Sequence, residues 1–142
     1  MAKIRRCFIP GDPNELRKDR VRISSAILQN LHSEGEEDVW PGPLRVGLVF
    51  WTLTYRMSDV GTPRVGVPDI DNLVAPTLNA MSHIFYDDDS AIADLRAINL
   101  YGLHAGIDIV VADWDEAEPR STPRHILGAP RVPDCQGGVE GP

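Results

Sequence analysis

The sequence predicts an α/β fold of the α+β type, with a small mixed β-sheet of about four strands and two helices packed on one face. Short segments rich in β-branched and aromatic residues have the composition of strands. The stretches between them carry apolar residues at helical spacing, which gives the order strand, helix, strand, helix, strand, strand (β-α-β-α-β-β). A chain of 142 residues can bury one core, so we expect one domain over residues 1–115.

The first strand is expected to end at Pro10-Gly11, and a capped helix follows it. Asp12 fits the N-cap, Pro13 the first helical position, and Glu15 the reciprocal carboxylate of a capping box. Gly35 fits the end of this helix. Apolar residues at helical spacing form its buried stripe, with Arg20 as the exception: Leu16, Ile23, Ile27 and Leu31.

A central strand is expected at residues 44–55, which are rich in Val, Leu, Phe, Trp and Thr. A second amphipathic helix follows, whose apolar positions are Leu73, Thr77, Leu78, Met81 and Ile84. Because a helix tolerates proline only in its first turn, Pro76 predicts either that this helix begins near Ala75 or that it is kinked at Pro76, and the late start is the favoured expectation. The residues before Ala75 are then expected to be extended.

The last two strands are expected at residues 92–101 and 107–114. The proline- and glycine-rich residues 116–142 are expected to form a disordered tail. The longest apolar stretch, around residues 46–53, is too short to cross a membrane, and residues 1–8 lack the apolar region of a signal peptide. We therefore expect a cytoplasmic protein with no membrane partner.

Charge is distributed unevenly along the chain. The formal net charge is −7, which by itself argues against a nucleic-acid partner, yet half of the 14 lysines and arginines lie within the first 22 residues. This asymmetry fits a basic DNA-contacting face beside an acidic metal site, and it fits a solvated helix face equally well. The candidate DNA-binding residues are Arg5, Arg6, Arg17, Lys18, Arg20 and Arg64.

Two clusters of aspartates flank the second predicted helix. Asp69 and Asp71 precede it, and Asp87, Asp88 and Asp89 follow it. Crowded carboxylates repel one another unless a cation or a proton compensates them, and Mg²⁺ suits this role because it prefers oxygen ligands. The clusters can meet only if the helix and the turn after it pack back. Either cluster alone is also typical of a helix cap or a solvated turn, so the ordered pair carries the prediction.

The same residues resemble the motif of a known family. The likeness rests on Asp69-Ile70-Asp71-Asn72-Leu73, a helix, Asp87-Asp88-Asp89 with Ile92, and Leu95-Arg96-Ala97-Ile98. This pattern resembles that of the RusA-like endodeoxyribonucleases, which are Holliday junction resolvases often encoded by phages and prophages. The likeness covers roughly residues 44–114 and is most specific in the middle third of the chain.

The resemblance implies a Mg²⁺-dependent nuclease, with Mn²⁺ as a second suitable ion, that cuts the phosphodiester bonds of four-way DNA junctions in recombination and repair. It implies that Asp69, Asp71 and Asp89 form the catalytic, metal-binding triad, with Asp88 as a metal-binding neighbour. It also implies a homodimer, whose two-fold symmetry would match that of the junction.

One position departs from the family pattern. The best-known members carry a lysine four residues after the second aspartate, where this chain has Ala75. Loss of a positive charge near the scissile phosphate would slow the chemistry, unless Arg64, Arg96 or His83 replaces it in space. A catalytically weak or inactive junction-binding module is therefore one alternative. A protein-interaction domain with no nucleic-acid role is another.

Overall fold

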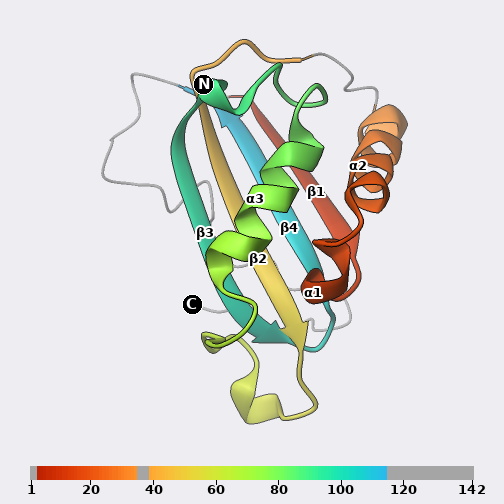
Figure 1. Ribbon diagram of the computed structural model, residues 1–142, viewed down its shortest axis with the longest axis vertical. Helices are drawn as coiled ribbons and strands as arrows, with labels where there is room; N and C mark the ends of the chain where they lie inside the picture. Colours follow the sequence, from red (N-terminus) through yellow and green to blue (C-terminus); the bar gives the residue numbers. More distant parts are fainter. Residues whose placement is uncertain (1–2, 35–38, 115–142) are drawn as a thin grey trace.

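A four-stranded mixed sheet forms the centre of the molecule (Figure 1). The computed structural model describes residues 3–34 and 39–114, so the predicted tail and the predicted helix end at Gly35 lie outside the described residues. The strands are β1 (Ile4–Pro10), β2 (Leu44–Leu53), β3 (Ile92–Gly102) and β4 (Gly106–Asp113), in the spatial order β1-β4-β2-β3. β2 is parallel to β3 and antiparallel to β4, which is antiparallel to β1. The predicted fold class is confirmed.

Helices cover one face of this sheet, and in Figure 1 α3 crosses in front of it. They are α1 (Pro13–Leu16), α2 (Arg20–Glu34) and α3 (Ile70–Met81), with short 3-10 helices η1 (Met57–Asp59) and η2 (Asp89–Ala91) in the connections. Alternate residues of β2 meet the helices and are fully buried: Leu44, Val46, Leu48 and Phe50. Burial of one such side chain contributes about 1.5–3 kcal/mol, so this core fixes the helices on the sheet. Among the described helices, none combines the length and apolar composition needed to cross a bilayer.

The first predicted helix is divided in two, so the observed order contains one helix more than predicted. Asp12 caps α1 as expected, its Oδ1 accepting a backbone N–H at 3.0 Å, but α1 ends at Leu16. Asp19 then accepts a second N–H at 3.1 Å, in the first turn of α2. The break lets both Leu16 and Ile23 reach the same core with no exposed surface. The prediction of one helix is wrong because the apolar spacing is continuous across the break, whereas the cap at Asp19 starts a second helix.

The helix between the aspartate clusters begins earlier than predicted. α3 starts at Ile70, with Asp69 as N-cap, and Pro76 lies inside it, so the predicted start near Ala75 is wrong. An interior proline costs roughly 3 kcal/mol because it removes a hydrogen bond and crowds the preceding turn. Burial of one side of α3 offsets this cost, through Leu73, Thr77, Ala80 and Met81. As a result Asp69 is extended, as predicted, whereas Asp71 lies in the first helical turn.

Candidate active site

The first aspartate cluster lies at the N-terminal end of α3. Asp69 has an extended backbone (φ −64°, ψ 155°), Asp71 lies in the first turn, and both residues are exposed. The helix dipole favours a carboxylate at this end by roughly 0.3–1 kcal/mol. Within the described helix, the Asp69 side chain makes no capping hydrogen bond. Its oxygens are therefore available to a ligand from outside the helix.

An open cavity of about 410 Å³ lies beside Asp69, and we call it the Asp69 cavity. Its walls are residues 63–66, the start of α3 at Asp69 and Ile70, and residues 97–99 of β3. Asn99 is paired in register with Phe50 of the core, so it lies on the side of β3 that faces the helices. The cavity therefore lies between the start of α3 and the sheet.

Arg64 lines the Asp69 cavity and is the only Lys or Arg among its described lining residues. Its backbone N–H donates to the Asn99 carbonyl at 2.9 Å, and its Nη2 donates to the Val67 carbonyl at 2.6 Å. The first bond ties the connection between β2 and α3 to β3, and the second lies within that connection. Arg64 also lines a smaller cavity of about 130 Å³ together with residues 12–14. The start of α1 thus shares this smaller cavity with Pro68 and Leu73, which flank the first aspartate cluster in the sequence.

The second aspartate cluster lies beyond the C-terminal end of α3 and forms a turn. The Asp88 carboxylate caps η2 by accepting the Ser90 N–H at 3.4 Å, and hydrogen bonding to Ser90 lowers the pKa of Asp88. The hydroxyl of the preceding Tyr86 donates to the Leu78 carbonyl at 2.9 Å. Burial, and then the charge of Asp89, raises the pKa of Tyr86. The turn thus places the exposed carboxylates of Asp87, Asp88 and Asp89 directly after the buried side chain of Tyr86.

The two clusters lie at opposite ends of α3 (Figure 1). A helix of 12 residues is about 18 Å long. The distance along β3 is similar. Asp69 lies beside residues 97–99 of β3, whereas Asp89 lies just before Ile92, the first residue of the strand. The five residue steps from Ile92 to Ala97 span about 16 Å. Among the described residues, no group of three or more His, Cys, Asp or Glu is placed to hold a metal ion. Within one chain, α3 and the following turn do not return Asp89 to Asp69.

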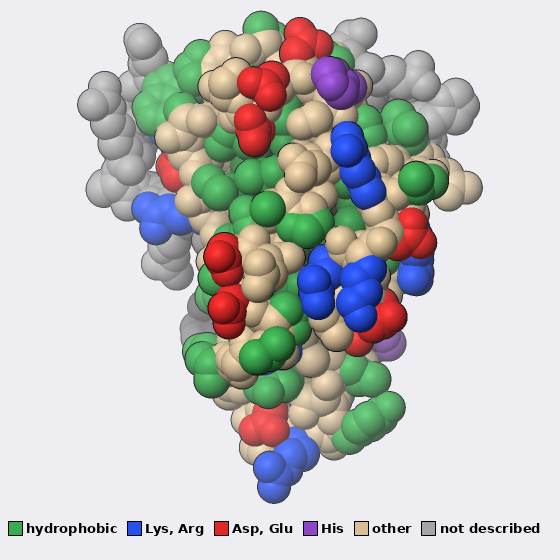
Figure 2. All heavy atoms as spheres, in the orientation of Figure 1, with side chains coloured by type: hydrophobic (Ala, Val, Ile, Leu, Met, Phe, Trp, Pro, Cys, Tyr) green, Lys and Arg blue, Asp and Glu red, His purple; other side chains and the backbone are tan. Residues whose placement is uncertain are grey.

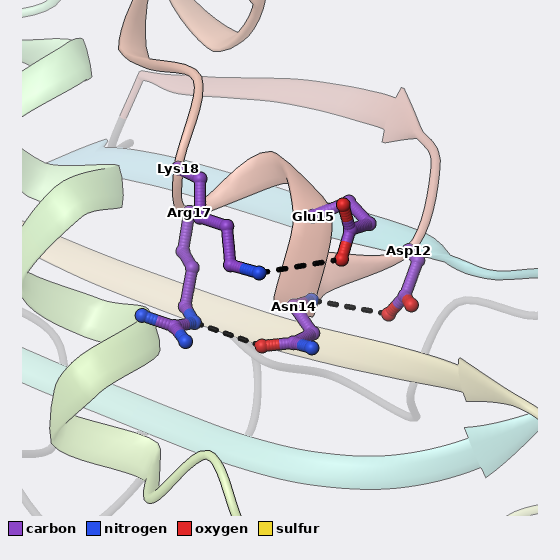
Figure 3. Close-up of polar contacts among 5 residues, drawn as sticks. All are labelled: Asp12, Asn14, Glu15, Arg17 and Lys18. Atoms are coloured by element: carbon purple, nitrogen blue, oxygen red, sulfur yellow. Dashed lines mark hydrogen bonds and ion pairs between the residues drawn. The ribbon is translucent and has the colours of Figure 1, made fainter.

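Basic side chains share a face with the first cluster. Figure 2 shows lysine and arginine side chains over α1 and the beginning of α2, and acidic side chains over the beginning of α3. In Figure 3, the Nε of Arg17 donates to the Oδ1 of Asn14 at 2.9 Å, and the Nζ of Lys18 lies 3.5 Å from Glu15. The second contact is an exposed ion pair, worth at most about 1 kcal/mol, so Lys18 can readily exchange Glu15 for a phosphate.

The other predicted DNA-binding residues differ in accessibility. Arg6 and Arg20 are exposed. Arg5 is only 6% exposed, and its guanidinium carbon lies 4.1 Å from the centroid of the Trp40 ring. A buried, stacked guanidinium stabilises the fold through cation–π contact and is not part of the accessible basic surface. Arg5 therefore differs from Arg6 and Arg20, which are on the accessible surface.

Ala75 is exposed and lies one helical turn beyond Asp71. Of the three residues considered as replacements for the family lysine, Arg64 lines the Asp69 cavity. Arg96 instead forms an ion pair of 3.7 Å within its own strand. His83 lies past the opposite end of α3, with a positive φ of 68°. The fold therefore favours Arg64 as the cation of this site.

Sequence reasoning missed Asn99 as a residue of the cavity. The available signal was an amide within a short, otherwise apolar run of the strand, Ala97-Ile98-Asn99-Leu100. Its orientation depends on the pairing of β3 with β2, which places it beside Asp69 rather than on the opposite face. That pairing is a long-range property and cannot be read from the strand alone.

Comparison with known proteins identifies the family to which the sequence is similar. The sequence matches the family described as Endodeoxyribonuclease RusA over residues 12–112, which include both aspartate clusters and the Asp69 cavity. A shorter segment is similar to the uncharacterized protein YqaN of Bacillus subtilis (strain 168), with 30% identity over 46 residues. That segment covers 32% of this chain and 32% of YqaN, so the likeness spans about a third of that relative. Because the RusA match extends from the cap of α1 into β4, the chain belongs to the RusA endodeoxyribonuclease family.

Proposed function

We propose that this chain cuts the phosphodiester bonds of four-way DNA junctions in a reaction that depends on Mg²⁺ or Mn²⁺. Membership of the RusA family supports a nuclease that acts on branched DNA. The observation that carries the proposal is a pair of exposed carboxylates, Asp69 and Asp71, beside a cavity that contains Arg64. Carboxylate oxygens suit a hard divalent cation, and a guanidinium suits a phosphate.

Each residue has a distinct role in this proposal. Asp69 and Asp71 would hold the cation, and Asp88–Asp89 would complete the acidic set. When bound, the cation would activate a water molecule for in-line attack and stabilise the leaving 3′-oxygen. Arg64 would neutralise an oxygen of the scissile phosphate, which is a role that the methyl group of Ala75 cannot perform.

A second copy of the chain would complete the acidic set. The length of α3, about 18 Å, separates the two clusters, whereas a Mg²⁺ ion binds its oxygen ligands at about 2 Å. A two-fold homodimer can place Asp89 of one protomer beside Asp69 and Asp71 of its partner, and it does so twice. Two such sites would act on symmetry-related strands of the junction.

One alternative is a junction-binding module that cuts weakly or not at all, and Ala75 favours it. In that case the exposed cations near α1, such as Lys18 and Arg20, would still neutralise phosphates. Binding would then weaken steeply with salt, while no cleavage product would form in Mg²⁺ or Mn²⁺. The two functions therefore share a binding surface and differ in the chemistry at the Asp69 cavity.

The test is cleavage of a labelled four-way junction and of a matching linear duplex, in Mg²⁺, in Mn²⁺ and in EDTA. We expect symmetric, metal-dependent nicking of the junction alone. Asp71→Asn should reduce cleavage by about 10²–10³-fold, because the cation that stabilises the developing charge is lost. Asp59→Asn, in η1 and away from the Asp69 cavity, is the control and should cut normally.

The outcomes separate the two functions. Cleavage by Asp71→Asn at the rate of the unsubstituted protein would contradict the assigned site. Junction binding with no product in either metal would favour the binding module. Circular dichroism of each variant should match that of the unsubstituted protein, since both substitutions change exposed or half-exposed side chains.

A further inference from the structure

We infer that Tyr55 is a base-stacking residue, whose ring contacts a base left unpaired at the branch point of the DNA and so favours four-way junctions over linear duplex. The inference rests on the proposed function and extends it to the choice of substrate. It begins from the exposure of one side chain. Tyr55 lies in the connection between β2 and α3, and it is 91% exposed.

Exposed apolar side chains are concentrated in this connection and its ends. Ten large apolar side chains of the described residues are exposed, and six of them lie within residues 53–70: Leu53, Tyr55, Met57, Val65, Val67 and Ile70. Single exposed apolar residues are common on protein surfaces, whereas a concentration of them indicates contact with another molecule. An exposed aromatic ring suits DNA in particular, because every base has a flat face on which the ring can stack.

The base of the connection is fixed to the sheet. The Thr54 N–H donates to the Gly102 carbonyl at 2.8 Å, and the Gly61 N–H donates to the Tyr101 carbonyl at 2.8 Å, so both limbs are bonded to the end of β3. In Figure 1 the connection projects beyond the ends of β2 and β3. Because Tyr55 directly follows Thr54, its backbone is anchored where the projection begins. A residue held in this way loses little freedom when it binds.

The charge of the connection also suits DNA. Residues 54–68 contain two arginines, Arg56 and Arg64, and one aspartate, Asp59, so this segment is positive although the whole chain has a formal net charge of −7. Arg56 is exposed and adjoins Tyr55 in the sequence, so it can neutralise a phosphate next to a stacked base. An aromatic ring with a neighbouring arginine therefore favours a nucleic acid over an uncharged apolar partner.

Tyr55 lies within reach of the proposed cleavage site. Asn99 and Asp69 line the same cavity, and Asn99 lies three residues before Gly102, to which Thr54 is bonded. Three strand residues span about 10 Å, and successive bases of a DNA strand are about 3.4 Å apart. The separation thus corresponds to about three bases from a phosphate at the Asp69 cavity. Stacking is interrupted at a branch point, and a base that is already unpaired costs least to expose.

The experiment measures the Kd of the full chain for a four-way junction and for a linear duplex of the same sequence, in EDTA so that no strand is cut. Tyr55→Ala should raise the Kd for the junction about 10-fold, because a base loses its stacking partner, and change the Kd for the duplex by less than about 2-fold. Tyr55→Phe keeps the ring and should bind like the unsubstituted protein. Leu28→Ala shortens an exposed apolar side chain on α2, so this control should change neither Kd.

A photochemical experiment on the unsubstituted protein locates the contact directly. Junctions that carry 5-iodouracil at the branch point should form a cross-link to Tyr55 on irradiation, and junctions that carry it in the middle of an arm should not. Mass spectrometry of the digested complex identifies the cross-linked residue. This measurement tests the inference even if Tyr55→Ala fails to fold.

Four results would overturn the inference. If Tyr55→Ala binds the junction as tightly as the unsubstituted chain, the inference fails while the proposed function stands. An equal loss of affinity for junction and duplex would contradict a role in substrate choice. Conversion of a dimer into monomers by Tyr55→Ala, seen by sedimentation, would show that a second copy contacts this residue instead. If the unsubstituted chain binds neither DNA, the proposed function fails and the inference fails with it.

Discussion

The two ends of α3 are similar in sequence, with Asp69 and Asp71 at its start and Asp87–Asp89 beyond its last turn, yet their surroundings differ. At the first end, the N-cap carboxylate makes no capping bond within the described helix and borders a cavity with Arg64. At the second end, Asp88 caps its own turn, and none of Asp87, Asp88 and Asp89 lines the Asp69 cavity. Aspartate content alone therefore does not identify a binding site. The first end differs because the Asp69 carboxylate makes no capping hydrogen bond within the described helix and lies beside a cavity that Arg64 also lines.

At the second end of α3, a short capped turn holds Asp89 at the surface. Asp88 closes η2 with its bond to Ser90, and Asp89 is the first residue of that turn. An exposed carboxylate on a short, capped turn suits contact with another molecule. In the proposed dimer, that molecule is the first end of the partner. Under that proposal, each acidic site is shared between two copies of the chain.

Apart from substitution of a metal ligand, we expect the largest loss of cleavage from replacing Arg64, which lies at the first end of α3. Arg64→Met should reduce the cleavage rate by about 10–100-fold, because a charge on the scissile phosphate loses its partner. It should also lower the salt dependence of junction binding by about one phosphate contact. Rates and affinities measured at several salt concentrations would check both expectations.

Arg96→Met is the control for Arg64→Met, since Arg96 is paired within its own strand and lies outside the Asp69 cavity. It should change the cleavage rate by less than about 3-fold, as expected for an exposed residue away from the site. If the two variants lose activity equally, the contrast between the Asp69 cavity and the remaining surface is contradicted.

An intermediate effect concerns the helix that separates the two ends. Pro76→Ala should stabilise the protein by about 1–3 kcal/mol, because an interior proline is replaced by a good helix former. Cleavage should be unchanged, since the side chain is outside the cavity. Chemical denaturation measures the difference in free energy of unfolding. A loss of stability would instead indicate that the helix begins near Ala75 with proline at its first position.

The smallest effect concerns the second end. Hydrogen bonding to Ser90 lowers the pKa of Asp88 below its ordinary value of 3.8. The charged form therefore stabilises the fold above that pH, and this contribution is lost as the pH falls through the folded-state pKa. Asp88→Asn should show a shallower fall of Tm below about pH 4 than the unsubstituted protein, and Asp87→Asn should not. Identical curves for all three would contradict a capping role for Asp88.

Most of the fold follows from local pattern. The strands agree with the prediction to within about two residues, because alternating β-branched and aromatic residues mark them directly. The two errors concern helices. At α1 and α2, a second cap at Asp19 breaks one apolar stripe, and at α3 the burial of a whole helix side outweighs the cost of Pro76. Both outcomes depend on tertiary packing, which local propensity does not contain.

The site was predictable only in part. The aspartates and Arg64 could be selected by residue type, and the structure places Asp69 and Arg64 around one cavity. Asn99 could not be selected, because its position depends on the register between β2 and β3. The distance between Asp89 and Asp69 depends on the directions in which α3 and β3 run. The order of residues in the sequence motif does not specify these directions.

In the proposed function two chains share each acidic site, and mixing two inactive variants would reveal such sharing. Asp71→Asn and Asp89→Asn, each inactive alone, would be unfolded together, refolded and assayed on a four-way junction. In a shared site, each mixed dimer has one site with both substitutions and one intact site, so activity should return to about a quarter of the unsubstituted level. The restored activity should nick one strand per junction. If the mixture is as inactive as its components, although mixed dimers form, each chain does not borrow Asp89 from its partner and the account is contradicted.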